Sequence, residues 1–125
     1  MKILIVDDSK MLRDMLVYAL NEGGYEDITE AIDGLDGLNK AKDNQHDLLI
    51  VDYNMPNMNG IDMIKEVKKL SNYKNIPIFM LTTEKSESLK QEAKESGAIG
   101  WINKPFAPDQ LLKAVNTVLK NIKKV

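Results

Sequence analysis

The sequence predicts a doubly wound α/β fold, in which five helices cover the two faces of a five-stranded parallel sheet. Two observations predict it. Short apolar runs of the kind that form buried strands recur five times along the chain of 125 residues. Segments with apolar residues every three or four positions separate these runs, as expected for helices that connect parallel strands. The predicted strands cover residues 3–6, 28–31, 48–51, 76–81 and 99–102, and the second is the weakest.

The helices are predicted from their apolar spacing and from their end signals. The first begins after Ser9 and ends at the glycine pair 23–24, since glycine is typical of helix ends. Another covers residues 35–43, a third follows Gly60, and the last begins near Pro108, because proline suits a first helical turn. Their apolar faces comprise Met11, Leu12, Met15, Leu16, Ala19 and Leu20; Leu35, Leu38 and Ala41; Ile61, Ile64, Val67 and Leu70; and Leu111, Leu112, Val115, Val118, Leu119 and Ile122.

The segment 86–96 is predicted to form the remaining helix, with the smallest apolar face. Leu89 is its strong apolar residue and Ala93 adds to it, while the rest is lysine, glutamate, glutamine and serine. Burial stabilises a helix by only ~25 cal/mol per Å² of apolar area removed from water. We therefore expect this helix to be held weakly and to be the most mobile.

Composition and charge exclude several classes of function. A net charge of -2 argues against a nucleic-acid surface, and the lysines 120, 123 and 124 are expected to be a solvated helix end. There is no cysteine, and the single His46 cannot build a histidine metal cluster. No apolar run reaches the ~18 residues of a membrane span, and the start lacks a signal-peptide pattern. We expect a cytoplasmic protein.

Polar side chains stand at the carboxyl ends of four predicted strands. Asp7-Asp8 follow the first strand, Asp52 the third, Thr82 the fourth and Lys104 the fifth. Each signal is weak alone, because Asp7-Asp8-Ser9 also fits a helix cap and the others also fit solvated strand ends. The carboxyl ends of parallel strands meet at one edge, so these groups are expected to converge.

The convergent groups suit phosphoryl transfer with a divalent cation. Close carboxylates repel one another, and an all-oxygen site with no histidine or cysteine favours Mg²⁺ or Mn²⁺. Such a cation neutralises phosphoryl oxygens, as Lys104 also can, and the Thr82 hydroxyl can donate a hydrogen bond. An aspartate can form an acyl phosphate, and Asp52 is the best candidate because Asp7 and Asp8 form a pair fitted to hold metal.

Taken together, these residues resemble response-regulator receiver domains, and specifically the CheY-like, single-domain chemotaxis regulators. The motifs are "ILIVDDSKMLR", "DLLIVDYNMPNMNGID", "PIFMLTTE" and "GAIGWINKPF", in the family's order and spacing. The resemblance covers essentially the whole chain. It implies a single receiver domain over residues 1–125, with a flavodoxin/CheY-like sheet in the strand order 2-1-3-4-5.

The resemblance also implies roles for the metal-binding and acceptor residues. Asp52 would accept the phosphoryl group from a histidine kinase. Asp8 and Asp52 would bind Mg²⁺ through their side chains, Asp7 would act through water, and Asn54 would use its backbone carbonyl. The bond between Lys104 and the following proline would be cis.

Further roles concern the response to phosphorylation. Thr82 would move toward the phosphoryl group, and Lys104 would contact it. Trp101 occupies the position of the family's switching aromatic, although a bulky indole packed on the surface is the alternative. Asn54 and Glu84 occupy positions that tune the lifetime of the phosphoryl group.

The implied protein is a phosphorylation-dependent switch of a two-component system and not an enzyme that acts on other substrates. Its partners would be a histidine kinase of the CheA type, a flagellar motor switch protein and a phosphatase. The protein itself would be a monomer that binds neither nucleic acid nor membrane. With no output domain expected, the face formed by the fourth helix, the fifth strand and the last helix would bind the partner. The sequence is also compatible with a role as a phosphate sink, or as a regulator of a pathway other than chemotaxis.

Two other classes share part of the pattern. An aspartyl-nucleophile phosphohydrolase usually carries two aspartates that flank one residue, whereas Asp52 is followed by Tyr53-Asn54. A flavodoxin-type cofactor binder needs a phosphate-binding loop rich in glycine, serine or threonine after the first strand, whereas "VDDSKM" offers two carboxylates.

Overall fold

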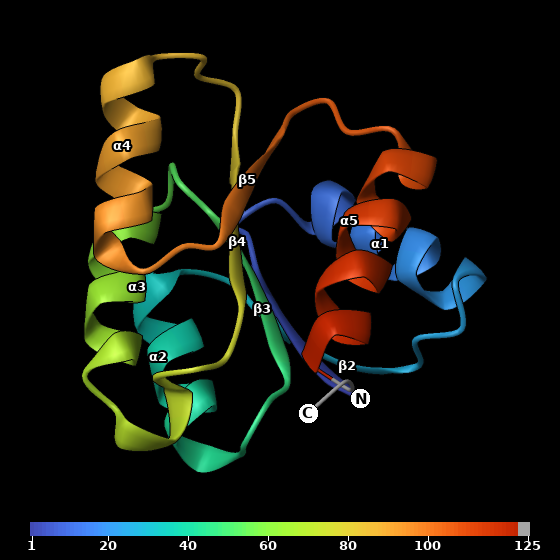
Figure 1. The fold of residues 1–125 in the computed structure, drawn as a ribbon, viewed down its shortest axis with the longest axis horizontal. Helices are drawn as coiled ribbons and strands as arrows, with labels where there is room; N and C mark the ends of the chain where they lie inside the picture. The colour runs from blue at the N-terminus through green and yellow to red at the C-terminus, as the bar shows by residue number, and fades with distance from the viewer. Residues whose placement is uncertain (123–125) are drawn as a thin grey trace.

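The five strands form one parallel sheet in the order β2-β1-β3-β4-β5, as predicted (Figure 1). A computed structural model describes residues 1–122 of the chain. The expected strands are all present, with ends that differ from the prediction by one or two residues. The strands are β1 (Lys2–Val6), β2 (Asp27–Ala31), β3 (Leu48–Asp52), β4 (Ile78–Thr82) and β5 (Gly100–Asn103).

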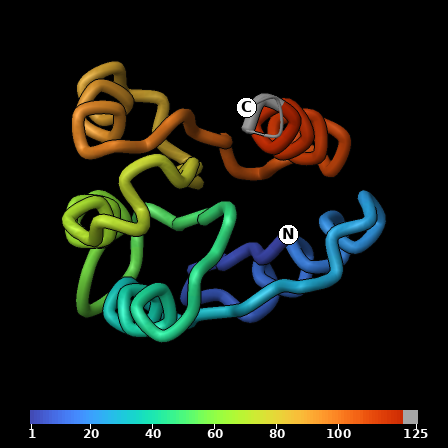
Figure 2. Tube along the Cα trace, turned by 60° about the horizontal axis from the view of Figure 1, so that its bottom comes forward, coloured from blue at the N-terminus to red at the C-terminus, as the bar shows by residue number. Residues whose placement is uncertain are grey.

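Five α-helices follow the strands and divide between the two faces of the sheet. Helices α2, α3 and α4 lie on one side, and α1 and α5 lie together on the other (Figures 1 and 2). The helices are α1 (Lys10–Glu22), α2 (Gly34–Asp43), α3 (Gly60–Lys68), α4 (Glu87–Ser96) and α5 (Pro108–Ile122), with a short 3₁₀ turn, η1 (Ser71–Tyr73). Within residues 1–122, no helix is long and apolar enough to span a membrane.

Two apolar cores form because successive residues of each strand point to opposite faces. Leu4 and Val51 lie in the core beneath α2, α3 and α4, whereas Ile5 and Ile50 lie in the core beneath α1 and α5. All five residues of β3 and of β4 are buried, which accounts for their continuous apolar sequence. This burial holds the central strands, and therefore their polar ends, in fixed positions.

Part of the apolar face predicted for α2 is wrong. Leu35 is 49% exposed, whereas Leu38 and Ala41 are buried as expected. The contact face of α2 also contains Gly34 and Gly37, which an apolar pattern does not reveal. A Cβ atom on Gly37 would lie 2.8 Å from the Val6 side chain, so the helix packs closer than any larger residue allows.

The first and last helices also depart from their predicted faces. Met11 and Met15 of α1 are 69% and 45% exposed, and they line an open groove beside Phe106 instead of the sheet. Regular spacing identifies one side of a helix but not how much of that side the sheet covers. On α5, Leu111, Val115 and Leu119 are buried and Leu112 and Val118 are half-buried. The side chain of Ile122, and the lysines 123 and 124, lie outside the described residues.

Helix α4 has the small apolar contact predicted for it. Its buried residues are Leu89, Ala93 and Ser96, compared with five on the shorter α3. Ser86 caps its first turn by accepting from the Leu89 N–H at 3.3 Å. Its expected mobility stays a prediction.

The single histidine belongs to a buried polar network that lies just before β3, at the start of the strand and not at its polar end. His46 Nδ1 and Nε2 lie 3.2 Å from the Tyr73 hydroxyl and from Thr29 Oγ1, respectively. Burial lowers the pKa of His46 below its ordinary value. This role in the core was not predicted, because its partners come from distant parts of the sequence.

Candidate functional site

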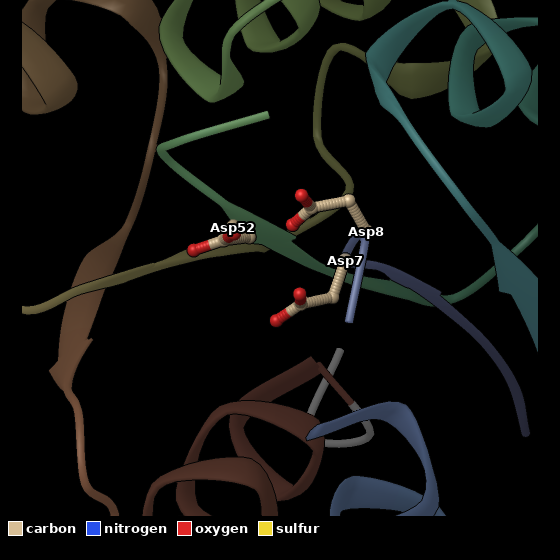
Figure 3. A group of neighbouring side chains, drawn as sticks. All are labelled: Asp7, Asp8 and Asp52. Carbon is tan, nitrogen blue, oxygen red and sulfur yellow. The ribbon is translucent and has the colours of Figure 1, made fainter. Parts of the chain in front are cut away.

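Three aspartates converge at the carboxyl edge of the sheet, as predicted (Figure 3). Strands β1 and β3 are direct neighbours, and Val6 pairs with Val51, so the residues that follow emerge side by side. One carboxylate oxygen from each of Asp7, Asp8 and Asp52 lies within 4.8 Å of the others. Figure 3 shows their carboxylates directed to the same side.

Burial differs among the three carboxylates. Asp7 is 0% and Asp52 is 3% exposed, whereas Asp8 faces solvent. Asp7 Oδ1 accepts the Ser9 N–H at 2.9 Å, and the Asp7 carbonyl accepts from Arg13 Nη1 at 2.7 Å. One oxygen of Asp7 is therefore held by the turn into α1, and the other is left for the site.

Lys104 supplies the positive charge that faces these carboxylates. Its Nζ lies 2.6 Å from Asp52 Oδ1 and 3.4 Å from Asp7 Oδ2, and its side chain is only 14% exposed. The Lys104 N–H donates to the Thr82 carbonyl at 2.9 Å, which continues the pairing of β5 with β4. The bond between Lys104 and Pro105 is cis, as expected.

One lysine does not balance this much negative charge. Burial, together with the nearby charges of Asp7 and Asp8, raises the pKa of Asp52 to about 6, although Lys104 opposes the rise. At neutral pH most Asp52 side chains are still ionised. The site therefore holds a buried carboxylate whose charge is only partly neutralised.

The donor set fits a hard divalent cation. Asp7 Oδ2 is buried without a hydrogen-bond partner, although the Lys104 ammonium lies at ion-pair distance. A buried charged oxygen with so little compensation is unfavourable unless a further cation binds. Carboxylate oxygens in such a group suit Mg²⁺ or Mn²⁺.

Thr82 ends β4, which pairs directly with β3. Asp52 pairs with Leu81, so Thr82 stands one residue beyond this pair and is 2% exposed. Its Oγ1 accepts the Glu84 N–H at 2.9 Å. A hydroxyl that accepts in this way keeps its own proton for an anion placed at the site.

Comparisons with known proteins decide the family. Residues 3–116 match the family model described as the response regulator receiver domain. The chain belongs to this family. It is 41% identical to the chemotaxis protein CheY1 of Helicobacter pylori over 95% of this chain and 97% of that protein. The CheY homolog of Campylobacter jejuni is 36% identical over 95% of this chain and 92% of that protein.

Solved structures agree with this assignment. The chemotaxis response regulator CheY4 of Vibrio cholerae superposes with a TM-score of 0.88 and 47% identity, over 94% of this chain and 97% of that chain. CheY-like receiver domains are signalling regulators rather than conventional enzymes. The strand order of this receiver domain is the expected flavodoxin/CheY-like order.

Trp101 of this receiver domain points outward from β5. The residue is 38% exposed, and Lys90 Nζ of α4 lies 4.9 Å from the centroid of its ring. This is the conformation of a surface ring packed against a neighbouring helix. Whether Trp101 also moves as a switch stays a prediction.

The two residues expected to tune the phosphoryl lifetime, Asn54 and Glu84, are both exposed. Asn54 lies in the loop after β3, between Asp52 and Gly60. The Gly60 N–H donates to the Tyr53 carbonyl at 2.9 Å, and a Cβ on Gly60 would lie 2.4 Å from the Asp52 carbonyl. Only glycine therefore allows α3 to begin so close to Asp52.

Two contributors to the site were not predicted. Arg13 holds the Asp7 carbonyl and also pairs with Glu30, at 3.2 Å from Nε to Oε1. Asn57 adopts a left-handed φ of 69° in the loop after β3. Asparagine tolerates this conformation, which is a weak sequence signal for it, whereas nothing in the sequence indicates that Arg13 binds a backbone carbonyl.

Proposed function

We propose that this receiver domain is a chemotaxis response regulator that is switched by phosphorylation of Asp52. The observation that carries the proposal is the placement of the buried Asp52 carboxylate 2.6 Å from the Lys104 ammonium and within 4.8 Å of the Asp7 and Asp8 carboxylates. One edge of the sheet would thus supply a nucleophile, a cation for the phosphoryl oxygens and a group of carboxylates for a metal.

In the proposed reaction, a carboxylate oxygen of Asp52 attacks the phosphorus of a phosphohistidine on a kinase of the CheA type. A new O–P bond forms as the P–N bond breaks, and the imidazole leaves with the electron pair. Asp7, Asp8, Asp52 and the Asn54 carbonyl would hold Mg²⁺, which supplies charge neutralisation for the phosphoryl oxygens when bound. Lys104, already in contact with Asp52, neutralises further charge.

The proposed response starts from the new negative charge on Asp52. The Thr82 hydroxyl donates to a phosphoryl oxygen, and this draws the loop that precedes α4 toward the site. Because α4 has few buried apolar residues, it yields more readily than α3. Phosphorylation then shifts the population between two arrangements of the α4-β5-α5 face, including Trp101.

The proposed partners follow from the chemotaxis relatives. We infer that the switched face binds a flagellar motor switch protein, and that the protein acts as a cytoplasmic monomer comprising a single receiver domain. Affinity capture with the protein loaded with Mg²⁺ and beryllium fluoride, which mimics a phosphoryl group, identifies the partner. Loss of the same partner in Asp52→Asn is expected. A partner set that does not depend on beryllium fluoride would contradict the proposed output.

Fluorescence of the single tryptophan tests the switch. Addition of Mg²⁺ and beryllium fluoride is expected to change Trp101 emission in the wild type and in Asp62→Asn, which alters an exposed carboxylate on α3. Asp52→Asn is expected not to respond, and Asp8→Ala is expected to lose Mg²⁺ binding. An equal response in Asp52→Asn would exclude Asp52 as the acceptor, and normal Mg²⁺ binding in Asp8→Ala would refute the metal assignment.

A further inference from the structure

The loop after β3 is tied to the beginning of α2 through one side-chain hydrogen bond. Asn57 Nδ2 donates to Asp33 Oδ2 at 2.8 Å. The other oxygen of Asp33 accepts the Asp36 N–H at 2.7 Å and caps α2. Because the cap fixes Asp33, the asparagine is held to a rigid helix end rather than to another loop.

The backbone of the loop is shaped to make this bond. Asn57 has a φ of 69°, and the Met58 N–H donates to the Pro56 carbonyl at 2.8 Å. A left-handed conformation at a residue other than glycine is unfavourable and persists where neighbouring contacts support it. The bond from Asn57 to Asp33 is one such contact.

Close packing fixes the loop on both sides of Asn54. A Cβ on Gly34 would lie 2.3 Å from the Met58 carbonyl, so the loop rests directly on the first turn of α2. At its other end, Gly60 packs on the Asp52 carbonyl. The segment that contains Asn54 is therefore held at one end by β3 and at the other end by α2.

We propose that Asn57 and Asp33 are positioning residues that set the Mg²⁺ affinity of the receiver site by holding the loop that presents the Asn54 carbonyl. The inference rests on the proposed function, because the Asn54 carbonyl is a metal ligand only there. The hydrogen bonds of the two side chains go to each other and to the start of α2, not to Asp7, Asp8 or Asp52. They act through the loop backbone. Without the hydrogen bond the loop has more conformational freedom, and the loss of that freedom when Mg²⁺ binds lowers the affinity.

The side chains offer variants that separate this bond from the helix cap. Asp33→Ser keeps an oxygen that can cap α2 but has no second oxygen for Asn57. Asn57→Gly keeps the left-handed backbone but has no amide. Asn57→Asp places two carboxylates together. The double variant Asp33→Asn/Asn57→Asp exchanges donor and acceptor at an unchanged net charge, and it restores a hydrogen-bonded pair.

Calorimetric titration with Mg²⁺ alone, together with thermal unfolding in its absence, tests the inference. We expect each single variant to bind Mg²⁺ about three- to tenfold more weakly, as for loss of one hydrogen bond, and the double variant to recover most of the affinity. Single variants that unfold at a lower temperature but bind Mg²⁺ as the wild type does would show a merely structural role and overturn the inference.

Two further outcomes separate this inference from the proposed function. Weak binding in the double variant, equal to that of Asn57→Asp, would show that the pairing is not what matters and would overturn the positioning role alone. Absence of Mg²⁺ binding in the wild type would overturn the proposed function and, with it, this inference.

Discussion

At the residue scale, Asp52 combines deep burial with a negative charge that a single lysine only partly neutralises. Its pKa of about 6 lies well above the ordinary value for aspartate, chiefly because of burial. The carboxylate therefore destabilises the metal-free fold at neutral pH. The same property leaves Asp52 ready to react with, or to bind, a group that brings compensating charge.

Removal of this charge should stabilise the metal-free protein. The folded state keeps the Asp52 proton to a higher pH than the unfolded state does, so the contribution of Asp52 to the free energy of unfolding falls as pH rises from about 4 to 6. Asp52→Asn has no carboxyl group to titrate at this position. Its free energy of unfolding should therefore exceed that of the wild type by about 1–3 kcal/mol at pH 7, with no difference near pH 4.

Urea unfolding of the wild type and Asp52→Asn across this pH range, with a chelator present, measures the difference. His46 titrates in both proteins, so its contribution cancels. A stability difference that does not change with pH would show that Asp52 has an ordinary pKa in the folded protein.

Lys104 should act as a competitor of the metal as well as an aid to the phosphoryl group. Its Nζ lies 2.6 Å from an Asp52 oxygen, so a divalent cation at the same carboxylate is repelled by it. Lys104→Met should therefore bind Mg²⁺ several-fold more tightly, roughly as expected for loss of one partly screened charge. Lys69→Met, which alters an exposed lysine at the C-terminal end of α3, is the control. Weaker Mg²⁺ binding in Lys104→Met would contradict this electrostatic role.

At the element scale, α4 and β5 are in contact through a cation–π pair between Lys90 and Trp101. Lys90 is only 19% exposed in its side chain, because it lies over the Trp101 ring. A cation over an indole contributes about 0.5–1 kcal/mol at a site of this kind. This contact belongs to the outward conformation of the tryptophan and stabilises it.

Lys90→Ala should therefore favour departure of the ring from this position. We expect stronger quenching of Trp101 by acrylamide, and switching at an about two- to fivefold lower concentration of beryllium fluoride with Mg²⁺. Lys94→Ala removes an exposed lysine one turn later on α4 and should change neither. Identical quenching and switching in Lys90→Ala and the wild type would show that the pair does not hold the ring.

At the scale of the whole molecule, one architectural fact places the site. Neighbouring parallel strands end at the same edge of the sheet, so polar residues from separate parts of the sequence meet there. This is why Asp7, Asp8, Asp52 and Lys104 were predictable as a group from apolar runs and the residues that end them. The contact of each helix with the sheet was less predictable, because a glycine such as Gly37, which packs against Val6, can form part of it.

The contacts that hold the site could not be predicted in the same way. Arg13 binds a backbone carbonyl, and Asn57 binds a helix cap, so both depend on the path of the chain rather than on residue type. The motif "MPNMNG" predicted a restrained loop after Asp52, with Gly60 at the tight start of α3. Its attachment to α2 through Asp33 required coordinates, since more than twenty residues separate the two side chains.

Location of the phosphoryl group tests the proposed function most directly. The protein should be incubated with Mg²⁺ and acetyl phosphate, and analysed by intact mass and by peptide mapping. We expect a single phosphoryl group on the peptide that contains Asp52, removable by hydroxylamine as an acyl phosphate is, present in Asp62→Asn and absent in Asp52→Asn. Undiminished phosphorylation of Asp52→Asn, or a phosphoryl group on a different residue of the wild type, would contradict the assignment of Asp52 as the acceptor.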